Sequence, residues 1–504
     1  MLYHITSVTA WEQAQRAGQY TPAAFAQEGF MHCSHAHQLA GVAYRFYRGQ
    51  AGLVILCIEP EQATAPIKHE ASGSSGELYP HLYGPLNTSA VRAVVPLPLQ
   101  PDGMLQMPPA LPRAPTRASQ EAFVPPTPWT VHIDEEVLTD LRDRLARVRW
   151  PDEIPGAGWQ YGTDLTYLKM FIEYWRTQYD WRTHEAQLNT FRHYTVPLGG
   201  IPLHFLHQPG VGPHPMPLLL LHGWPGSIWE FHKLIPLLTD PARFGGDASD
   251  AFTIVAPSLP GYTFSYRPQQ PRLDRTAMAD VCAALMTEVL GYQRFGAQGG
   301  DIGTSVATRL GLAYPERLCG IHLNFLGLFR DVSQPGQPTT EEARYLQEVE
   351  HWLAEEVGYQ WMQGTKPQTL SYGLTDSPVG LAAWIVEKFR TWSDCEGEVE
   401  RCFTKDEMLT NIMLYWTTGA INAAFWPYYS TRHGDWTLPA SPRITVPTAY
   451  MAFPREILRP PRTMAERVLN IQRWTTADCG GHFAALEQPA ALAADIRAFF
   501  RALR

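Results

Sequence analysis

The sequence predicts an α/β protein: a doubly wound, mostly parallel sheet with a helical cap insertion, preceded by a small separate α+β domain. Short apolar runs alternate with helical runs between residues 218 and 326, which is typical of buried parallel strands joined by crossover helices. A helical stretch rich in tryptophan and tyrosine then interrupts this pattern from about 328 to 440. A proline-rich stretch separates the pattern from the first 98 residues.

At 504 residues the chain is too long for one hydrophobic core, so two or three domains are expected. Its composition, 45% hydrophobic and 18% charged, is ordinary for a globular protein. A net charge of −9 without long basic runs argues against a nucleic-acid partner. The seven cysteines form no CxxC pair, the N-terminus has no signal pattern, and no apolar run reaches membrane-spanning length. A cytoplasmic location without a membrane anchor is therefore expected.

The domain boundaries follow changes in composition along the chain. Runs at 52–58 and 91–97 are strand-like, and eight prolines between residues 99 and 128 indicate an extended linker. The predicted divisions are a small α+β domain at 1–98, a linker at 99–128, a lead-in segment at 129–200, the first part of the α/β core at 201–327, a helical cap at 328–440 and the second part of the core at 441–504.

The lead-in is predicted to hold two helices and a hairpin. The helices are expected at 135–149, with one apolar stripe, and at 165–179, and the hairpin strands at 191–197 and 201–207 around a Gly-Gly turn. In the core, near-continuous apolar runs predict buried strands, with helices between them. The strands are expected at 218–221, 252–256, 295–298, 321–326, 445–452 and around 472–474, and the helices at 276–290, 304–312 and 490–504.

The most informative motif is Gly-Gly-Asp-Ile-Gly at residues 299–303, between a predicted strand and a predicted helix. Strand, glycine turn and helix in this order make a nucleophile elbow, which presents serine in Gly-x-Ser-x-Gly proteins and Asp301 here. A carboxylate that attacks a saturated carbon makes an ester, which water can cleave, whereas serine would make an ether. The motif predicts a hydrolase that opens a C–O or C–halogen bond. The alternative is a turn with an N-cap aspartate.

Two backbone N–H groups are candidates for stabilising the oxyanion formed during ester hydrolysis. The run His-Gly-Trp-Pro-Gly-Ser at 222–227 follows the first parallel strand, and its turn can aim the N–H of Trp224 at the elbow. Ile302, the residue after the nucleophile, would supply the second N–H. A glycine-proline loop after a strand is also common without such a role.

The order nucleophile, acid, histidine along the chain selects the other two members of a triad. His482, in Gly-Gly-His-Phe after the last strand, is the candidate base for the hydrolytic water. Glu456 follows the strand predicted at 445–452 and is the candidate acid that holds the imidazole. Asp478 and Glu487 are rival acids by proximity in sequence.

Together these motifs resemble the microsomal-type epoxide hydrolases over about residues 122–504, with that family's N-terminal segment at 129–200. The resemblance implies the α/β-hydrolase fold, a nucleophile at Asp301, a base at His482 and an acid at Glu456. The resembling segments are Asp180-Trp181-Arg182, 222–227, 299–303, Thr365-Lys366-Pro367, 376–384, 414–419, 453–456 and 480–485.

The same resemblance implies two proton donors for the epoxide oxygen. Opening an epoxide leaves an alkoxide, and a tyrosine with a pKa of about 10 is a suitable donor. Composition does not select among the 22 tyrosines. The resemblance points to Tyr359 and Tyr428, with Tyr429 as the alternative to Tyr428.

The chain departs from the family in two places. The family often has tryptophan after the nucleophile, where this chain has Ile302, which changes the pocket wall and not the backbone N–H. Membrane-bound members have an N-terminal anchor, where this chain has its front domain.

The front domain resembles a small uncharacterised bacterial family, which implies no settled activity. The resembling segments are 3–5, 28–34 and 80–86. No metal is expected at His32, Cys33, His35 and His37, because their spacing is not a standard zinc pattern. Whether the front domain carries a second binding or catalytic site is not decided by the sequence.

We therefore expect an epoxide hydrolase that needs no cofactor, with an epoxide and water as its only small-molecule partners. The aromatic cap predicts an apolar or aromatic substrate. A haloalkane dehalogenase with the same nucleophile and base is the first alternative, and a non-catalytic scaffold acting through the front domain is the second. The sequence does not decide whether the protein forms a homodimer.

Overall fold

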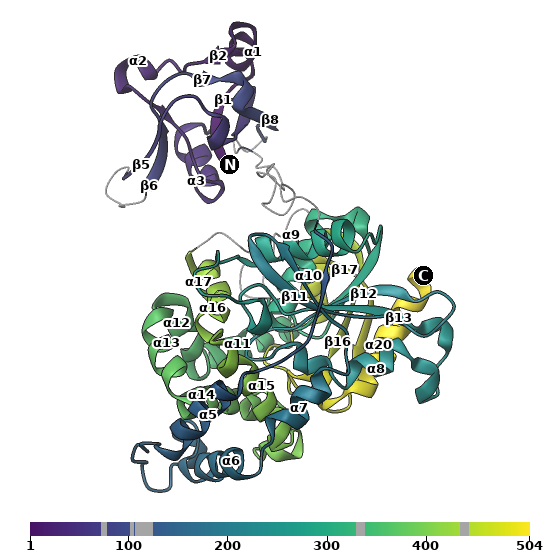
Figure 1. The fold of residues 1–504 in the computed structure, drawn as a ribbon. Coiled ribbons are helices and arrows are strands. Elements are labelled where there is room, and N and C mark those ends of the chain that lie inside the picture. Colours follow the sequence, from purple (N-terminus) through teal and green to yellow (C-terminus); the bar gives the residue numbers. More distant parts are fainter. Residues whose placement is uncertain (72–77, 101–104, 106–123, 329–337, 434–442) are drawn as a thin grey trace. The chain divides into compact units, whose positions relative to one another are not determined.

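The computed structural model describes residues 1–71, 78–100, 105, 124–328, 338–433 and 443–504 (Figure 1). The chain forms two compact units, Met1–Thr116 and Arg117–Arg504, each with a hydrophobic core of its own. Most of the predicted linker lies outside the described residues, as do 329–337 and 434–440 of the predicted cap.

The front unit is the predicted α+β domain. Its strands are β1 (Leu2–Ser7), β2 (Gln19–Tyr20), β3 (Met31–His32), β4 (Leu53–Ile58), β5 (Ile67–Ala71), β6 (Leu78–Leu82), β7 (Leu86–Asn87) and β8 (Val91–Leu97), and its helices are α1 (Val8–Ala17), α2 (Phe25–Glu28) and α3 (Ala36–Phe46). Two antiparallel sheets have the orders β1-β4-β8 and β3-β6-β5, and β2 pairs with β7. The strands predicted at 52–58 and 91–97 are confirmed as β4 and β8.

The second unit is built on one nine-stranded sheet. Its strands are β9 (Thr127–Trp129), β10 (His193–Leu198), β11 (Ile201–Gln208), β12 (Met216–Leu221), β13 (Phe252–Pro257), β14 (Phe295–Gly299), β15 (Leu318–Leu323), β16 (Ile444–Ala452) and β17 (Leu469–Thr476). Their order is β17-β16-β15-β14-β12-β13-β11-β10-β9. The ladders from β13 to β17 are parallel, and β9, β10 and β11 join antiparallel. The predicted mostly parallel sheet is confirmed.

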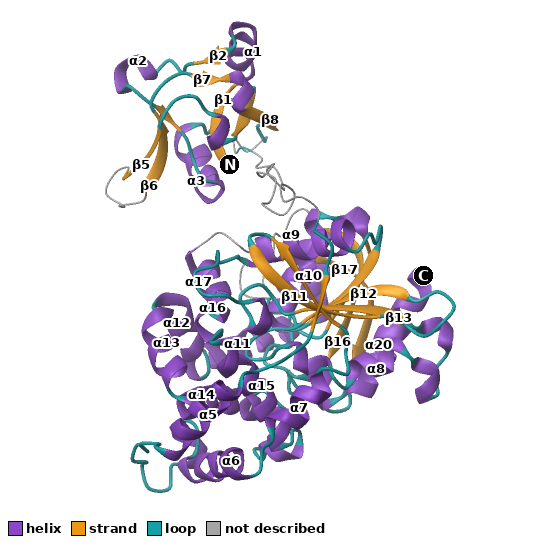
Figure 2. Cartoon of the chain, in the orientation of Figure 1, coloured by secondary structure: helices purple, strands orange, loops and turns teal. Residues whose placement is uncertain are grey.

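Helices cover both faces of this sheet, as the doubly wound prediction requires. They are α8 (Leu234–Thr239), α9 (Arg275–Ala284), α10 (Asp301–Ala313), α18 (Arg462–Val468), α19 (Ala484–Glu487) and α20 (Pro489–Phe500). α9 packs against α10 and α8 against α20, and the sheet lies between these two pairs (Figure 2). Fully buried residues of the central strands, such as Leu218, Ile254 and Ile321, fill the core between these layers.

The cap is a set of helices inserted between β15 and β16. They are α11 (Thr340–Glu355), α12 (Gly358–Thr365), α13 (Pro367–Asp376), α14 (Pro378–Thr391), α15 (Lys405–Thr418), α16 (Ile421–Ala424) and α17 (Trp426–His433). Capping residues fix where two of them begin: Thr339 and Thr404 each form a capping box with the glutamate three residues on. In the described part of the chain, no helix combines the length and the apolar character needed to cross a membrane.

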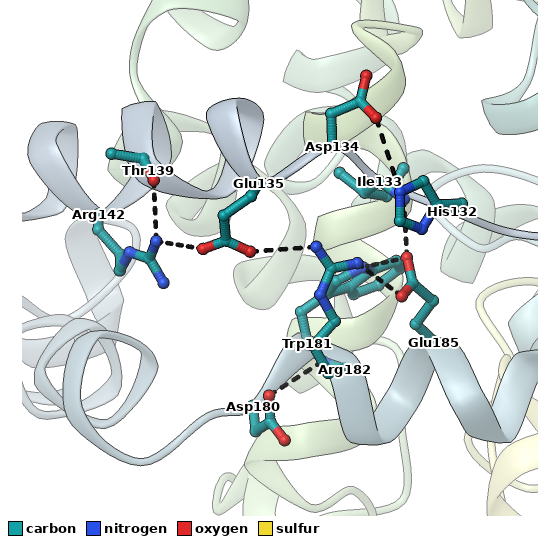
Figure 3. Close-up of polar contacts among 10 residues, drawn as sticks. All are labelled: His132, Ile133, Asp134, Glu135, Thr139, Arg142, Asp180, Trp181, Arg182 and Glu185. Carbon is teal, nitrogen blue, oxygen red and sulfur yellow. Dashed lines mark hydrogen bonds and ion pairs between the residues drawn. The ribbon is translucent and has the colours of Figure 1, made fainter.

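The lead-in holds α5 (Glu135–Ala146), α6 (Leu165–Thr177) and α7 (Trp181–Leu188). A polar network ties α5 to α7 (Figure 3). Glu185 accepts the backbone N–H of Ile133 at 2.7 Å and the Trp181 indole N–H at 3.0 Å, and Arg182 reaches from Glu185 to Glu135 on α5. The segment Asp180-Trp181-Arg182 is therefore the start of a helix that fixes the entry of the chain into the core.

Several predicted boundaries differ from the structure. β15 begins at Leu318 and ends at Leu323, because the apolar residues after it line a cavity instead of pairing in the sheet. The helix predicted at 276–290 ends as α9 at Ala284 and continues as a π-helical turn, and the one predicted at 304–312 begins at Asp301. β9 contains the last two residues of the predicted linker, 127 and 128. The spacing of apolar residues does not show at which residue a strand or helix stops forming its regular backbone hydrogen bonds.

Candidate active site

Asp301 lies at the sharp turn between β14 and α10. Its φ of 46° is in the left-handed region, which few residues other than glycine adopt and which aspartate tolerates better than most. The turn requires glycine at position 303, because a Cβ there would lie 2.1 Å from the carbonyl oxygen of Leu221 on β12. The turn therefore raises the Asp301 carboxyl group above the carboxyl ends of the central strands, with 16% of its side chain exposed.

One of the two predicted oxyanion donors binds this carboxyl group. The N–H of Trp224, in the loop after β12, donates to Asp301 Oδ1 at 2.8 Å. Ile302 is the second residue of α10, where N–H groups have no acceptor within the helix and carry partial positive charge. The Trp224 N–H thus contacts the carboxyl group directly, and the part of the Ile302 N–H stays a prediction.

The loop that carries Trp224 is held by helix α15 of the cap. Asn411 donates to the carbonyl oxygen of Pro225 at 2.8 Å and accepts from the Ser227 hydroxyl at 2.8 Å. The Tyr415 hydroxyl donates to the carbonyl oxygen of Gly226 at 2.6 Å. All three bonds are buried, so the cap helix fixes the position of the N–H that reaches Asp301.

His482 lies between two carboxyl groups. Its Nδ1 is 2.6 Å from Glu456 Oε1, and its Nε2 is 3.7 Å from Asp301 Oδ2. Burial lowers the pKa of His482, but the charge and hydrogen bond of Glu456, together with the charges of Asp301 and Glu230, outweigh burial and raise the pKa to about 9. The imidazole is therefore oriented by Glu456 and charged when Asp301 is ionised.

Backbone contacts bring the two loops of this pair together. Arg455 and Gly481 form a parallel β-bridge, and the N–H of Arg455 donates to the carbonyl oxygen of Gly480 at 3.1 Å. The N–H of His482 donates to the carbonyl oxygen of Trp392 in the cap at 2.8 Å. The rival acids lie elsewhere: Asp478 is exposed, and Glu487 accepts the backbone N–H groups of Asp394 and Phe483.

Two of the three candidate tyrosines line the cavity above Asp301. Tyr359 on α12 and Tyr428 on α17 are buried with ring centroids 5.9 Å apart, and Tyr359 stacks on Trp224. Burial, and then the charge of Asp301, raise the pKa of both hydroxyl groups, which keeps them protonated. Tyr429 is half-buried, stacks between Trp426 and His433, and does not line the cavity.

The cavity has a volume of about 420 Å³ and lies between the core and the cap. Its walls are mostly apolar, and its polar members include Arg275, which donates to the Ser305 hydroxyl at 2.9 Å. The apolar and aromatic lining residues are Ile302, Phe325, Leu326, Leu328, Trp352, Leu353, Val357, Trp361, Ile457 and Leu458.

Three further residues of the site, Glu230, Gln298 and Asn324, were not predicted from the sequence. All three lie beside Asp301 and His482. Glu230 had a signal: it is an acidic residue within the apolar run Ile-Trp-Glu-Phe at 228–231, directly after the Trp224 loop. Gln298 and Asn324 are ordinary residues in sequence and become neighbours only because β14 and β15 pair in parallel.

In the front unit, the residues considered for a metal have other surroundings. Cys33 is buried, which raises the pKa of its thiol to about 12, and His32 pairs with Glu28 on the surface. His35 stacks on His69, and the side chain of His37 lies outside the described residues. Among the described residues, no three His, Cys, Asp or Glu side chains are grouped as metal ligands.

Three family matches cover most of the chain. Residues 126–231 match the family described as "Epoxide hydrolase N terminus", and residues 216–324 match the "alpha/beta hydrolase fold". Residues 5–94 match a "Protein of unknown function (DUF952)".

The fold and these matches define an α/β hydrolase. A protein of Stigmatella aurantiaca whose name assigns it to the epoxide hydrolases is 43% identical over 75% of this chain and 85% of its own length. Epoxide hydrolase 1 of Sus scrofa is 36% identical over 74% of this chain and 88% of its own. The crystal structure of the juvenile hormone epoxide hydrolase from the silkworm Bombyx mori aligns with a TM-score of 0.69 at 30% identity, over 77% of this chain and 97% of its own. The chain belongs to the microsomal-type epoxide hydrolases and carries an additional N-terminal domain.

Proposed function

We propose that this epoxide hydrolase converts an apolar or aromatic epoxide into a vicinal diol through a covalent ester on Asp301. The observation that carries the proposal is the arrangement around one carboxyl group. The Asp301 carboxylate is bound by the Trp224 N–H, has His482 Nε2 3.7 Å from its other oxygen, and shares a cavity with Tyr359 and Tyr428. The arrangement supplies a nucleophile, a base and two proton donors.

In the first step Asp301 Oδ2 attacks the less hindered epoxide carbon, and the C–O bond of the ring breaks. The Tyr359 and Tyr428 hydroxyls bind the departing oxygen, and a proton from one of them neutralises the alkoxide. A phenol is far more acidic than an alcohol, so this transfer is favourable even where burial raises the pKa of the tyrosines. The product of the step is a hydroxyalkyl ester of Asp301.

In the second step water attacks Cγ of the ester and gives a proton to His482 Nε2. The oxyanion forms on Oδ1, where the Trp224 N–H already donates and the Ile302 N–H is the expected second donor. Collapse breaks the bond from Cγ to the alkyl oxygen, which takes the proton from His482 and leaves as the diol. The carboxylic acid left on Asp301 then loses its proton, which restores the tyrosinate of the first step to a neutral tyrosine. Because the ester carries no charge, one of the influences that raise the pKa of His482 is removed, and the imidazole becomes available as a base.

The lining of the cavity supports an apolar or aromatic substrate. Trp352, Trp361 and Phe325 supply flat apolar surfaces, and the volume of about 420 Å³ falls within the usual range for small-molecule sites.

Trapping the ester tests the proposal. In His482→Gln the first step remains and the second loses its base, so incubation with styrene oxide is expected to add the mass of the whole epoxide to the peptide that contains Asp301. Peptide mass spectrometry detects this adduct, and Asp301→Asn in the same background is the control that removes it. An unmodified peptide in His482→Gln, under conditions where the wild type forms diol, would contradict the covalent route.

The dehalogenase alternative is decided with the wild-type protein. A bromoalkane replaces styrene oxide in parallel reactions, and released bromide is measured beside the diol. We expect diol without bromide, because the cavity offers two tyrosine hydroxyls to an oxygen leaving group. Bromide release without diol formation would establish the alternative.

A further inference from the structure

A second, small cavity lies beside Asp301, with a volume of about 20 Å³. Its polar walls are Asp301, His482, Glu230, Gln298 and Asn324. A buried water needs about 10–15 Å³ of such space and two to four polar partners. The cavity therefore has the size and the lining of a site for one water molecule, and Asp301 belongs both to it and to the substrate cavity.

The geometry of the predicted base agrees with a water at this place. His482 Nε2 and Asp301 Oδ2 are 3.7 Å apart, too far for a direct hydrogen bond. Polar groups at this separation are commonly joined by water. A molecule bound there is within reach of both the imidazole and the carbonyl carbon that the ester presents.

Glu230 is held against this cavity by its surroundings. It lies in the short helical turn Ile228–Phe231, and its carboxyl group lies over the backbone of Gly226, where a Cβ would be 1.4 Å from Oε1. Position 226 therefore requires glycine as long as the carboxyl group occupies this place. Within the described part of the chain, no hydrogen bond or ion pair reaches the Glu230 carboxyl group, although a buried carboxyl is costly without a partner.

The side-chain oxygen of Gln298 is a second hydrogen-bond acceptor without a donor among the described residues. Its side-chain N–H donates to Asn324 Oδ1 at 2.7 Å, which fixes the amide plane. Its Oε1 is buried and has no hydrogen-bond partner among the described residues. Two acceptors without protein donors, on the walls of a water-sized cavity, are the expected partners of the two hydrogens of one water.

We propose that Glu230 positions the water that hydrolyses the Asp301 ester, a role that rests on the proposed ester mechanism. The water donates one hydrogen bond to Glu230 and the other to His482 Nε2, and Gln298 Oε1 binds it before the ester forms. Its oxygen then faces Cγ of Asp301, to which it adds while its proton passes to Nε2. Glu230 touches the attacking water and not the epoxide, so it acts only in the second step.

The electrostatics of Glu230 fit a role that begins once the ester exists. Burial raises the pKa of Glu230 to about 8, the charge of His482 lowers it, and the charge of Asp301 raises it. Formation of the ester removes the Asp301 charge, and the positive charge that His482 gains when it takes the proton from water also lowers the pKa of Glu230, so both changes favour the ionised form of Glu230 during ester hydrolysis. An anion at this place stabilises the imidazolium that forms when His482 takes the proton from water.

The test separates the two steps with a pair of variants. Glu230→Met keeps an unbranched side chain and removes the acceptor, whereas Glu230→Gln keeps a neutral acceptor. Stopped-flow mixing with styrene oxide measures ester formation, and rapid quench with mass spectrometry measures ester decay. In Glu230→Met we expect the rate of ester decay to fall by about tenfold or more, because one hydrogen bond to the reacting water is lost. The rate of ester formation is expected to stay unchanged. In Glu230→Gln the slowing is expected to be smaller, about threefold to tenfold.

Because only decay slows, kcat and KM are expected to fall together in Glu230→Met, which a general loss of structure does not produce. Decay at the wild-type rate, or equal loss of both steps, would overturn the role of Glu230. If Glu230→Met does not fold, Glu230→Gln decides by the same criterion: wild-type decay overturns the role. If the wild type itself forms no ester, the proposed function fails, and this outcome is distinct from wild-type decay in the variants.

Discussion

At the scale of single residues, the environments of three neighbouring tyrosines separate their roles. Tyr359 and Tyr428 are buried in the cavity wall and their pKa values are raised, while Tyr429, next in sequence to Tyr428, turns to Trp426 and His433. Because α17 turns by about 100° per residue, adjacent residues face different directions. The helix thus presents Tyr428 to the cavity and Tyr429 to Trp426 and His433 on its own surface.

This difference predicts the result of removing each hydroxyl. Tyr359→Phe and Tyr428→Phe each remove one donor to the epoxide oxygen, so the rate of ester formation is expected to fall by about a hundredfold in either variant. Tyr429→Phe is the matched control and is expected to leave the rate unchanged. Single-turnover kinetics with styrene oxide measure all three, and a loss in Tyr429→Phe equal to that in Tyr428→Phe would reverse the assignment.

The sequence predicted which residues lie close together where each of them belongs to a motif. The glycine turn around Asp301, the chain order of the triad and the loop after β12 are local signals, and the structure brings Asp301, His482, Glu456 and the Trp224 N–H together. Gln298 and Asn324 have no such signal, because their proximity depends on the pairing of β14 with β15. Glu230 is marked as an acidic residue in an apolar run, but this local signal does not show that it lies beside Asp301. Side-chain direction within α17 likewise required the structure.

At the scale of elements, helix α15 connects the cap to the chemistry of the core. Asn411 and Tyr415 lie one turn apart on this helix and both bind the loop that places the Trp224 N–H. The types and order of the core elements followed from apolar runs, since buried parallel strands and amphipathic helices differ in period. Their ends did not: β15 ends at Leu323 although the apolar sequence continues, because cavity-lining residues are as apolar as strand residues.

Asn411→Ala is expected to impair both stability and catalysis. It leaves the Ser227 hydroxyl and the Pro225 carbonyl without their buried partner, a cost of about 1–3 kcal/mol for each group. The loosened loop also misplaces the Trp224 N–H, so kcat is expected to fall by about tenfold or more. Urea unfolding and steady-state kinetics measure the two effects.

Thr417→Ala is the control on the same helix. The Thr417 hydroxyl bonds the Met413 carbonyl of its own helix and does not touch the loop. Only a small loss of stability and a normal kcat are expected for it. A normal kcat in Asn411→Ala, beside a clear loss of stability, would show that α15 supports the fold and not the catalytic N–H.

At the scale of the whole molecule, the chain is two units with separate cores. The second unit begins with β9, which pairs with β10 and carries Trp129 against His204 and Phe264, with ring centroids 5.1 Å and 4.8 Å away. The change in composition near residue 99 revealed that a division exists. It did not reveal that the chain re-enters a sheet at residue 127, because a three-residue strand that contains proline has no detectable pattern.

The division predicts how truncated chains behave. Residues 117–504 keep all nine strands of the second unit and are expected to retain the kcat/KM of the full chain. Residues 132–504 lose β9 and the packing of Trp129, and their Tm is expected to fall by several degrees. Thermal unfolding and diol formation measure both, and inactivity of a folded 117–504 chain would show that the front unit takes part in epoxide hydrolysis.

The bonds from α15 to the Trp224 loop also bear on how substrate range can change within this architecture. A side chain that only shapes the cavity, such as Trp352 on α11 or Trp361 on α12, is free to vary with the epoxide to be accepted. The face of α15 that carries Asn411 and Tyr415 cannot vary in the same way, because these two side chains bind the loop of the core that holds Trp224. Directed evolution toward bulkier epoxides is therefore best confined to the cavity-lining residues of α11 and α12 other than Tyr359, leaving that face of α15 as it is.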